Sequence, residues 1–307
     1  MQLVDKCFYK VKKDYLKFLK KEKINKKSMS SKIYNLKKIY IPIAFWINEK
    51  YKKKEKTLFI GFAGSQGSGK TTITSILKII LKIFFKREIH VSSIDDFYKT
   101  FKDRKKMSRQ IHPLFETRGV PGTHDINMIK NFFIRIKKKK FKKFYLPKFD
   151  KSIDDRMEKK YWYNIKKKPE IIILEGWCVG AKPQLESLIK KPINIVEKHE
   201  DNNSIWRNYA NEKLKKEYKN LFGMIDHFIY MKIPNFDIVF KWRFLQEDKL
   251  KKKINSNKKT MSYKEIKRFI MFYERITLQM MKDLSKSASV TMFLKKNHQI
   301  KKILFRS

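Results

Sequence analysis

Residues 58–71 read LFIGFAGSQGSGKT, an apolar run followed by a glycine-rich turn and a Lys-Thr pair. The apolar run predicts a buried strand, and the residues after Thr71 have the apolar spacing of a helix. The last eight residues match the pattern GxxxxGK[ST] in full. Glycines in such a turn let backbone N–H groups face phosphate oxygens, and the helix N-terminus adds partial positive charge. The segment predicts a P-loop that binds a nucleotide through Gly64, Ser65, Gln66, Gly67, Ser68, Gly69, Lys70, Thr71 and Thr72.

The P-loop residues also predict individual roles and exclude some reactions. Lys70 is expected to reach the β- and γ-phosphates of ATP, and the Thr71 hydroxyl to hold Mg²⁺. The alternative, a glycine-rich turn that binds nothing, is disfavoured because both flanks fit the motif. No Asp begins the DxxG of GTPases, and the run IIIL at 171–174 closes with the single carboxylate Glu175. Helicase and transporter ATPases would need a tandem acid pair there.

The rest of the chain alternates apolar runs with amphipathic stretches. Runs at 89–94, 171–174, 228–233 and 290–294 predict strands, and stretches at 71–85, 126–136, 235–249 and 262–284 predict helices. This alternation predicts an α/β fold, a doubly wound parallel sheet of about five strands with helices on both faces. Residues 1–55 are lysine-dense and lack glycine, which predicts a helical N-terminal extension broken near Pro42 and followed by one domain over 56–307.

The composition of the 307 residues is strongly basic, with 75 Lys and Arg against 30 Asp and Glu and a net charge of +45. Such a charge suggests a nucleic acid or an anionic membrane as partner. However, 64 of the 75 basic residues are lysines in dispersed runs, which favours a solvated surface shaped by AT-rich coding. We therefore expect no specific nucleic-acid partner.

The cysteines and the apolar stretches bear on location. Cys7 and Cys178 are too few and too distant for a disulfide framework or a metal quartet, which favours a reducing compartment. The N-terminus has no apolar signal region, and the most apolar stretch, 73–85, is interrupted by two lysines. The sequence predicts a cytoplasmic protein with no membrane partner.

A pair of acids follows the second expected strand, in the segment SIDDFY at 93–98. Asp95 lies 25 residues after Lys70, where that strand should end at the carboxyl edge of the sheet. Ligands of doubly wound sheets bind at this edge, and a carboxylate there could take the proton of an attacking hydroxyl. The alternative is an Asp that only caps the next helix.

Several further motifs carry a family resemblance. They are DDFY (95–98), RGVPGTHD (118–125), PKFDKS with a following DDR (147–156), LEGWCVG (174–180), WRFLQE (242–247) and FYERIT (272–277). Together with the P-loop they resemble the D-glycerate 3-kinase family, a branch of the P-loop kinases that also include uridine kinase, phosphoribulokinase and pantothenate kinase. The likeness extends from about residue 41 to residue 306.

The resemblance implies site residues. Asp95 would be the catalytic base with Asp96 as the fallback, and Glu175 would hold Mg²⁺ together with Thr71. The substrate side would comprise Tyr98, Arg118, His124, Asp125 and Arg156. Arg243 would belong to a lysine-rich lid at about 243–262 that closes over the nucleotide phosphates. The carboxylate of the substrate would be anchored by Arg118, Arg156, Lys151 or Arg275. DDR stands where relatives often carry a glycine-rich insert, which leaves the geometry of the acceptor loop open.

The implied function is transfer of the γ-phosphoryl group of ATP to a hydroxyl, with Mg²⁺ as cofactor and a small hydroxylated acid as substrate. D-glycerate, giving 3-phosphoglycerate, is the expected acceptor. A uridine- or pantothenate-type kinase on the same fold is the alternative. The charge keeps a nucleic-acid-associated ATPase open as a different class, and a degenerate ATP-binding regulator is a third, disfavoured by the intact Lys70, Thr71, Asp95 and Glu175.

Overall fold

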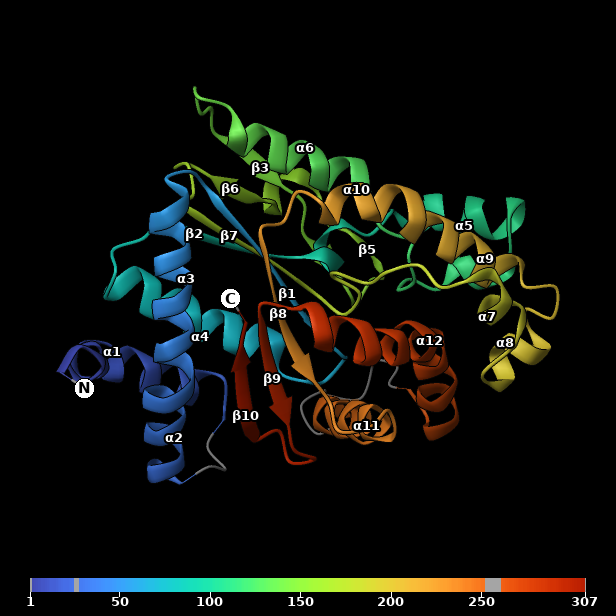
Figure 1. Cartoon of the computed structure of the whole chain (residues 1–307). Helices are drawn as coiled ribbons and strands as arrows, with labels where there is room; N and C mark the ends of the chain where they lie inside the picture. Colours follow the sequence, from blue (N-terminus) through green and yellow to red (C-terminus); the bar gives the residue numbers. More distant parts are fainter. Residues whose placement is uncertain (1, 25–27, 252–260, 307) are drawn as a thin grey trace.

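The computed structural model describes residues 2–24, 28–251 and 261–306. A six-stranded sheet lies at its centre, in the order β10-β9-β8-β1-β7-β2 (Figure 1). The strands are β1 (Leu58–Gly64), β2 (Ile89–Ser93), β7 (Ile171–Gly176), β8 (His227–Lys232), β9 (Val290–Leu294) and β10 (Ile300–Phe305). The first five are parallel to one another, which confirms the expected α/β fold with a doubly wound sheet.

The expected count of about five strands was incomplete, because β10 adds a sixth, antiparallel strand beside β9. All seven residues of β1 and all six of β7 are buried, and such central strands give the continuous apolar runs that the sequence reveals. β10 reads IKKILF and is half-exposed at the edge of the sheet. Its lysines interrupt the apolar run, so the pattern that marks the other strands is missing.

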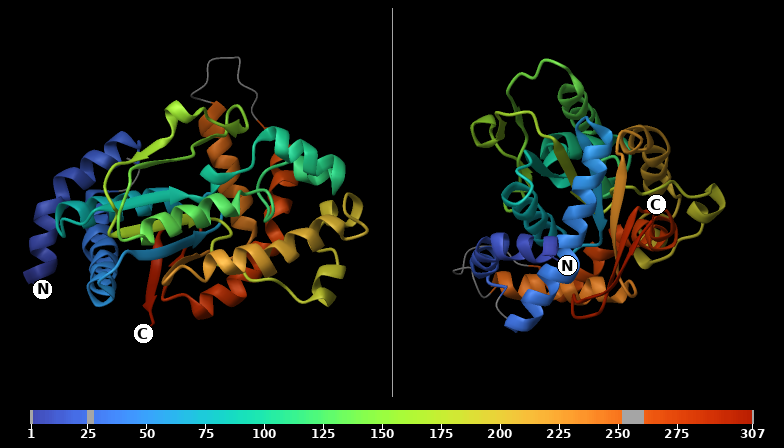
Figure 2. Two further views of the ribbon diagram at one scale, coloured as in Figure 1. Left: turned by 90° about the horizontal axis from the view of Figure 1, so that it is seen from above. Right: turned by 60° about the vertical axis from the view of Figure 1, so that its left-hand side comes forward.

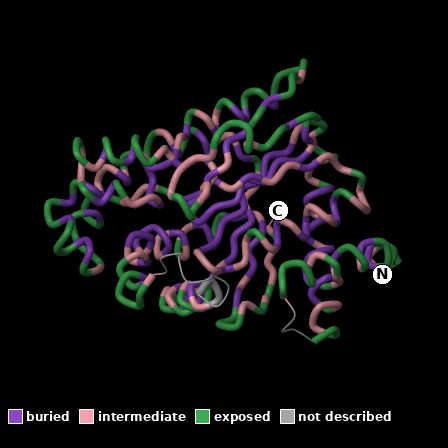
Figure 3. The backbone as a smooth tube through the Cα atoms, turned by 180° about the vertical axis from the view of Figure 1, so that it is seen from behind, coloured by how far each residue is buried: buried purple, intermediate pink, exposed green. Residues whose placement is uncertain are grey.

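Helices cover both faces of the sheet, and alternate residues of the strands face two separate cores. One core joins the sheet to α6 (Ile126–Lys137), η5 (Leu214–Tyr218), α10 (Lys219–Phe222) and α12 (Tyr263–Ser287). The other core joins it to α4 (Lys70–Ile83), α11 (Asp237–Lys251) and the N-terminal helices. Figure 3 shows the buried residues concentrated along the central strands between these layers.

Further short elements surround the sheet. The helical ones are η2 (Ile94–Phe97), α5 (Phe101–Gln110), η3 (Pro113–Glu116), η4 (Lys159–Tyr161), α7 (Glu186–Lys190), α8 (Ile195–His199) and α9 (Ile205–Lys213). Two small antiparallel pairs are formed by β3 (Phe144–Leu146) with β6 (Tyr163–Ile165), and by β4 (Phe149–Asp150) with β5 (Asp155–Arg156). The β4–β5 hairpin packs beside η2, directly after β2.

The N-terminal residues form α1 (Gln2–Lys21), α2 (Met29–Asn35), the π-helical turn η1 (Leu36–Tyr40) and α3 (Ile41–Lys54). They lie on the side of the sheet that carries α4 (Figure 2). The expected break near Pro42 is wrong, because Pro42 sits in the first turn of α3 directly after the widened turn η1. A widened turn accommodates the missing N–H of proline. Helix α1 ends at Lys21, and the next helix starts only at Met29.

None of the helices in the described ranges combines the length and the apolar character that a membrane crossing requires.

Candidate active site

The P-loop joins the end of β1 to the first turn of α4. Gly67 and Gly69 have φ angles of 71° and 92°, in the left-handed region that glycine adopts without strain. A Cβ atom at Gly67 would also lie 2.7 Å from the Cβ of Trp242, so no side chain fits there. These two glycines shape the turn, and the free N–H groups at the start of α4 follow it directly.

Lys70 begins α4, and its side chain turns back over the loop. Its Nζ donates to the carbonyl oxygen of Ser65 over 3.0 Å, and Ser68 Oγ donates to the same oxygen over 2.7 Å. Burial lowers the pKa of Lys70, whereas the carboxylates of Glu175 and Asp95 raise it. Burial is the larger effect and disfavours the charge of Lys70, and the two nearby acids offset part of it.

Glu175 lies near the end of β7, the strand next to β1. Its Oε1 accepts a hydrogen bond from Thr71 Oγ1 over 2.8 Å, while its buried Oε2 has no hydrogen-bond partner in the described part of the chain. Burial raises the pKa of Glu175, and the charge of Lys70 lowers it. A hydroxyl and a carboxylate with one unpartnered oxygen match the donors that Mg²⁺ takes alongside substrate phosphates. The described residues contain no cluster of three or more His, Cys, Asp or Glu that would hold a metal by itself.

Asp95 and Asp96 lie within η2, which directly follows β2, and Ser93 of β2 pairs with Glu175 in the sheet, so all these acids share one edge. Asp95 Oδ2 accepts from Lys151 Nζ over 2.6 Å, and its buried Oδ1 has no partner among the described residues. Burial alone would raise the pKa of Asp95. The nearby cations, Lys151 foremost, outweigh this effect and lower the pKa to about 2. Asp95 is therefore a carboxylate at neutral pH.

Asp96 has the opposite character. Its Oδ1 accepts from the backbone N–H of Phe149 over 3.3 Å. Burial raises its pKa to about 6, and the negative charge of Asp95 raises it as well. Of the two neighbouring aspartates, Asp95 thus has the lower pKa and the direct cationic partner.

Tyr98 and His124 form a stacked pair, with ring centroids 4.4 Å apart. His124 Nδ1 lies 2.6 Å from the hydroxyl of Tyr218, and its buried Nε2 has no hydrogen-bond partner in the described structure. Burial lowers the pKa of His124 to about 4, so the imidazole is neutral near pH 7. The pair lies close enough to Asp95 for the charge of that carboxylate to affect the pKa of both rings.

Arg156 and Asp125 lie next to each other and close to Tyr98. Arg156 NH2 donates to the carbonyl of Tyr98 over 2.8 Å and lies 3.7 Å from Asp125, while its buried Nε lacks a partner in the described ranges. Asp125 Oδ1 accepts from the backbone N–H of Met128 over 3.0 Å and so caps α6. Asp125 therefore stabilises the N-terminus of α6.

Arg118 and Arg243 line a cleft of about 280 Å³ together with Asp154, Met261 and residues of α5, η3 and α12. Arg118 pairs with the carboxylate of Asp154, and Arg243 pairs with Glu247 over 2.8 Å. The expected lid at about 243–262 lies partly outside the described residues, which omit 252–260. The described ends of that segment bring Arg243 and Met261 to the cleft.

Sequence reasoning gave no role to some residues that the structure brings to the site. Tyr273 of α12 donates to the carbonyl of Arg118 over 3.2 Å, and the charges of Asp95, Arg118 and Arg243 all act on its hydroxyl. His298, in the β9–β10 turn, stacks on Trp242 with ring centroids 4.1 Å apart, and its Nε2 lies 2.8 Å from the carbonyl oxygen of Gly67. Tyr273 stands in the quoted motif FYERIT, whereas no pattern in the sequence singles out His298.

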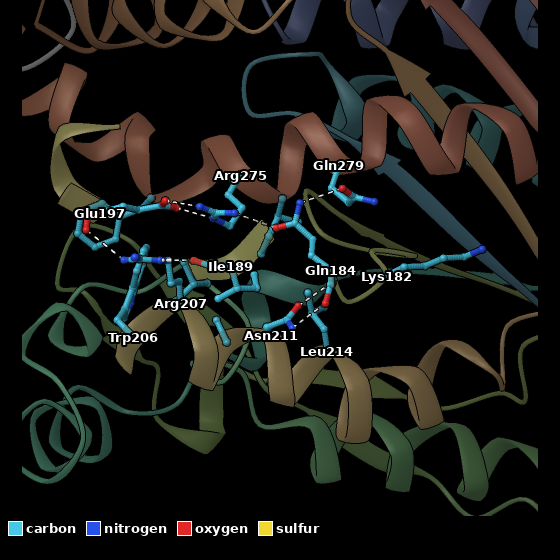
Figure 4. A pocket seen from close by; sticks show the side chains of 14 residues that line it. Lys182, Gln184, Ile189, Glu197, Trp206, Arg207, Asn211, Leu214, Arg275 and Gln279 are labelled. Atoms are coloured by element: carbon cyan, nitrogen blue, oxygen red, sulfur yellow. Dashed lines mark hydrogen bonds and ion pairs between the residues drawn. The ribbon is translucent and has the colours of Figure 1, made fainter. Parts of the chain in front are cut away.

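Arg275 is not available to anchor a substrate. Its five N–H groups donate to Glu197, Gln184 and the carbonyls of Leu188 and Lys191. Figure 4 shows it pointing at Glu197 across a pocket between α12 and α9. The pocket encloses only about 20 Å³, which suffices for a single water molecule. The candidate anchor Arg275 is therefore a structural residue that ties α12 to the segment before α9.

No family model matches the chain, but its relatives of known sequence are kinases. An uncharacterized kinase of Schizosaccharomyces pombe, mug58, is 31% identical over 235 residues, which are 73% of this chain and 82% of that protein. The chloroplastic D-glycerate 3-kinase of Arabidopsis thaliana is 27% identical over 251 residues, 76% of this chain and 52% of that protein.

A solved structure shares the fold. The D-glycerate 3-kinase of Cryptococcus neoformans superposes with a TM-score of 0.72 at 20% identity, covering 87% of this chain and 99% of that one. This structural match shows the fold, and the sequence similarity to mug58 shows the class of the protein. The chain belongs to the family of ATP-dependent P-loop kinases that includes mug58, to which D-glycerate 3-kinase is also related.

Proposed function

We propose that the protein transfers the γ-phosphoryl group of ATP to a hydroxyl of D-glycerate, giving 3-phosphoglycerate. One observation carries the site assignment: five buried side-chain atoms without a hydrogen-bond partner in the described structure belong to the expected site residues. They are Gln66 Oε1, Asp95 Oδ1, His124 Nε2, Arg156 Nε and Glu175 Oε2. Buried polar atoms without partners are rare because each is costly, so their concentration supports a site built for a ligand.

The proposed reaction uses two groups of the site, Asp95 and Lys70. The acceptor oxygen forms a bond to the γ-phosphorus of ATP, the bond from that phosphorus to the oxygen of ADP breaks, and Asp95 takes the hydroxyl proton. The low pKa of Asp95 keeps it ionised before the reaction, and the proton leaves to solvent afterwards. Lys70 offsets negative charge on the phosphates.

Thr71 and Glu175 would hold Mg²⁺, because their oxygens fit a hard cation and one of them has no other partner. The cation, when bound, neutralises part of the charge of the nucleotide phosphates. The P-loop residues 64–72 and Arg243 would bind the nucleotide. Glu175 orients the Thr71 hydroxyl through its own hydrogen bond.

The acceptor side comprises Tyr98, Arg118, His124, Asp125 and Arg156. Arg118 is the best candidate for the carboxylate anchor, because it already holds the carboxylate of Asp154 and lines the cleft. The neutral His124 and the ring of Tyr98 would form an uncharged wall beside Asp95. We also propose a cytoplasmic location, since Cys7 and Cys178 are both free and buried.

A panel of acceptors tests this proposal. The purified protein is incubated with Mg-ATP and D-glycerate, uridine, pantothenate or RNA, and ADP release is followed, with Lys70→Met as the inactive control. We expect turnover with D-glycerate. Turnover with uridine or pantothenate alone would assign another acceptor, and stimulation by RNA alone would show a nucleic-acid-associated ATPase instead.

A further inference from the structure

The tip of the β4–β5 hairpin carries two opposite charges into the acceptor side of the site. Lys151 donates to Asp95 Oδ2 over 2.6 Å, and three residues later the Asp154 carboxylate pairs with Arg118. Asp150 Oδ1 closes the turn by accepting from the backbone N–H of Ser152 over 2.8 Å. Residues 151–154 thus neutralise both Asp95, the proposed base, and Arg118, the proposed anchor.

These two contacts match the two groups of a hydroxylated acid. Such an acceptor must bring a hydroxyl to Asp95, where the Lys151 ammonium now lies, and an anion to Arg118, where the Asp154 carboxylate now lies. Substrate and hairpin tip therefore compete for the same two side chains. A neutral alcohol could replace the contact at Asp95 but not the charge at Arg118.

The hairpin is built so that its tip can leave. Its strands are two residues each, and the side chains of Lys151 and Asp154 are 61% and 36% exposed, so both ion pairs are accessible to water. Asp154 has a φ of 55°, in the left-handed region that aspartate tolerates in turns.

The hairpin is also held by contacts that do not involve Asp95 or Arg118. Arg104 is fully buried and donates to the carbonyl oxygens of Asp154 and Glu116, each over 2.5 Å, and its NH2 group lies 3.1 Å from Asp154 Oδ2, the carboxylate oxygen that does not face Arg118. Asp155 accepts from the backbone N–H of Phe101 over 3.0 Å. These contacts can keep the hairpin in place while Lys151 leaves Asp95 and Asp154 leaves Arg118.

We propose that residues 151–154 are a displaceable internal occupant of the acceptor site, and that Asp154 competes for Arg118 with the anionic group of the acceptor. This proposal rests on the proposed phosphotransfer and adds a determinant of specificity to it. Because only an anion can displace Asp154 from Arg118, the hairpin favours acids over neutral alcohols.

The test measures binding of D-glycerate, and of glycerol as its uncharged analogue, by titration calorimetry in the presence of a non-hydrolysable ATP analogue. Asp154→Asn removes the competing charge but keeps an acceptor oxygen near Arg104. We expect it to tighten D-glycerate binding about fivefold and to leave glycerol unchanged. Glu158→Gln, which removes an exposed carboxylate that pairs only with Lys160 in the described structure, is the matched control and should change neither.

Weaker or unchanged binding of D-glycerate by a folded Asp154→Asn protein would overturn the proposal, because Asp154 would then position Arg118 instead of competing for it. Lys151→Met provides a second variant that leaves Arg104 untouched. It should also tighten D-glycerate binding, and weaker binding would make Lys151 the carboxylate anchor and contradict the proposal.

The acceptor panel separates failure of this proposal from failure of the proposed function. If the wild-type protein phosphorylates pantothenate and not D-glycerate, the proposed acceptor is wrong, and Asp154→Asn must then tighten pantothenate binding in the same way. If the protein phosphorylates only the uncharged uridine, both proposals are contradicted.

Discussion

Two neighbouring aspartates at the end of β2 differ because of their surroundings. Burial raises the pKa of each, but only Asp95 has Lys151 in direct contact, together with the nearby charge of Lys70. The result is a pKa of about 2 for Asp95 and of about 6 for Asp96. Asp95 is thus ionised at neutral pH and able to accept a proton. Asp96 changes between its protonated and ionised forms near pH 6.

The pH dependence of activity distinguishes the two residues as bases. A base with a pKa of about 2 is ionised at every pH from about 5 to 8, so kcat/KM should show no acid limb from Asp95 in that range. A base with a pKa of about 6 would lose activity as the pH falls through 6. An acid limb near pH 6 that disappears in Asp96→Asn would move the base to Asp96.

Glu175 provides a second prediction, for the cation. Replacing its carboxylate by an amide in Glu175→Gln removes the charge that faces Thr71 and the cation. We expect the apparent affinity for Mg²⁺ to fall about 10- to 100-fold. Calorimetric titration of Mg²⁺ into the protein with ATP measures this directly. Glu186→Gln, on the exposed helix α7, is the control, and equal Mg²⁺ affinities in the two variants would contradict the role of Glu175.

At the scale of elements, the turn between β9 and β10 holds the P-loop against α11. Trp242 of α11 stacks on His298 and donates through Nε1 to the carbonyl of Lys296 over 2.9 Å, while His298 contacts the carbonyl oxygen of Gly67. The residue after Trp242 is Arg243, which lines the cleft. The turn therefore links the P-loop to the helix that leads to the expected lid.

Removing this link should weaken nucleotide binding. His298→Ala removes one hydrogen bond to the P-loop, worth about 1 kcal/mol, so KM for ATP should rise about fivefold while kcat changes little. His298→Asn can still donate to Gly67 and should restore most of the affinity. Lys295→Ala, in the same turn, is the control. A fall in kcat at unchanged KM would show that the contact does not act through nucleotide binding.

The buried pair of Arg275 and Glu197 ties α12 to α8 and gives a prediction about stability. Removing one partner of such a pair leaves a buried charge, so Glu197→Gln should lower the free energy of unfolding by about 3 kcal/mol. KM for the acceptor should stay unchanged, because the pair does not reach the cleft. Denaturant unfolding and steady-state kinetics measure both. An increase in the KM of the acceptor without a loss of stability would return Arg275 to the substrate side.

For the whole molecule, the sequence was sufficient where the structure depends on continuous burial or on a local motif. The five parallel strands appear as apolar runs because helices cover both faces, and the P-loop appears because its glycines and Lys70 are adjacent. The half-exposed β10 and the true break after α1 have no such signal. The roles of the residues expected on the substrate side came from the resemblance to a family, because the spacing of these residues in the sequence does not predict them.

The contacts that complete the site depend on the whole fold. Lys151 reaches Asp95 across 56 positions of the chain, and His298 reaches Gly67 across 231. No local pattern encodes such pairs, because they depend on how the hairpins fold back onto the sheet edge. The net charge of +45 likewise says little about this site, where the important charges are a few lysines and arginines paired with carboxylates.

The central claim is that the carboxylate of Asp95, at the edge of the sheet beside the P-loop, allows transfer from ATP to D-glycerate. Phosphorus NMR of Mg-ATP with D-glycerate follows the product directly, with the wild-type protein and with Asp95→Asn. The account predicts 3-phosphoglycerate from the wild type, and from Asp95→Asn no product despite an ATP affinity within about threefold of the wild type. Undiminished formation of 3-phosphoglycerate by Asp95→Asn would contradict it.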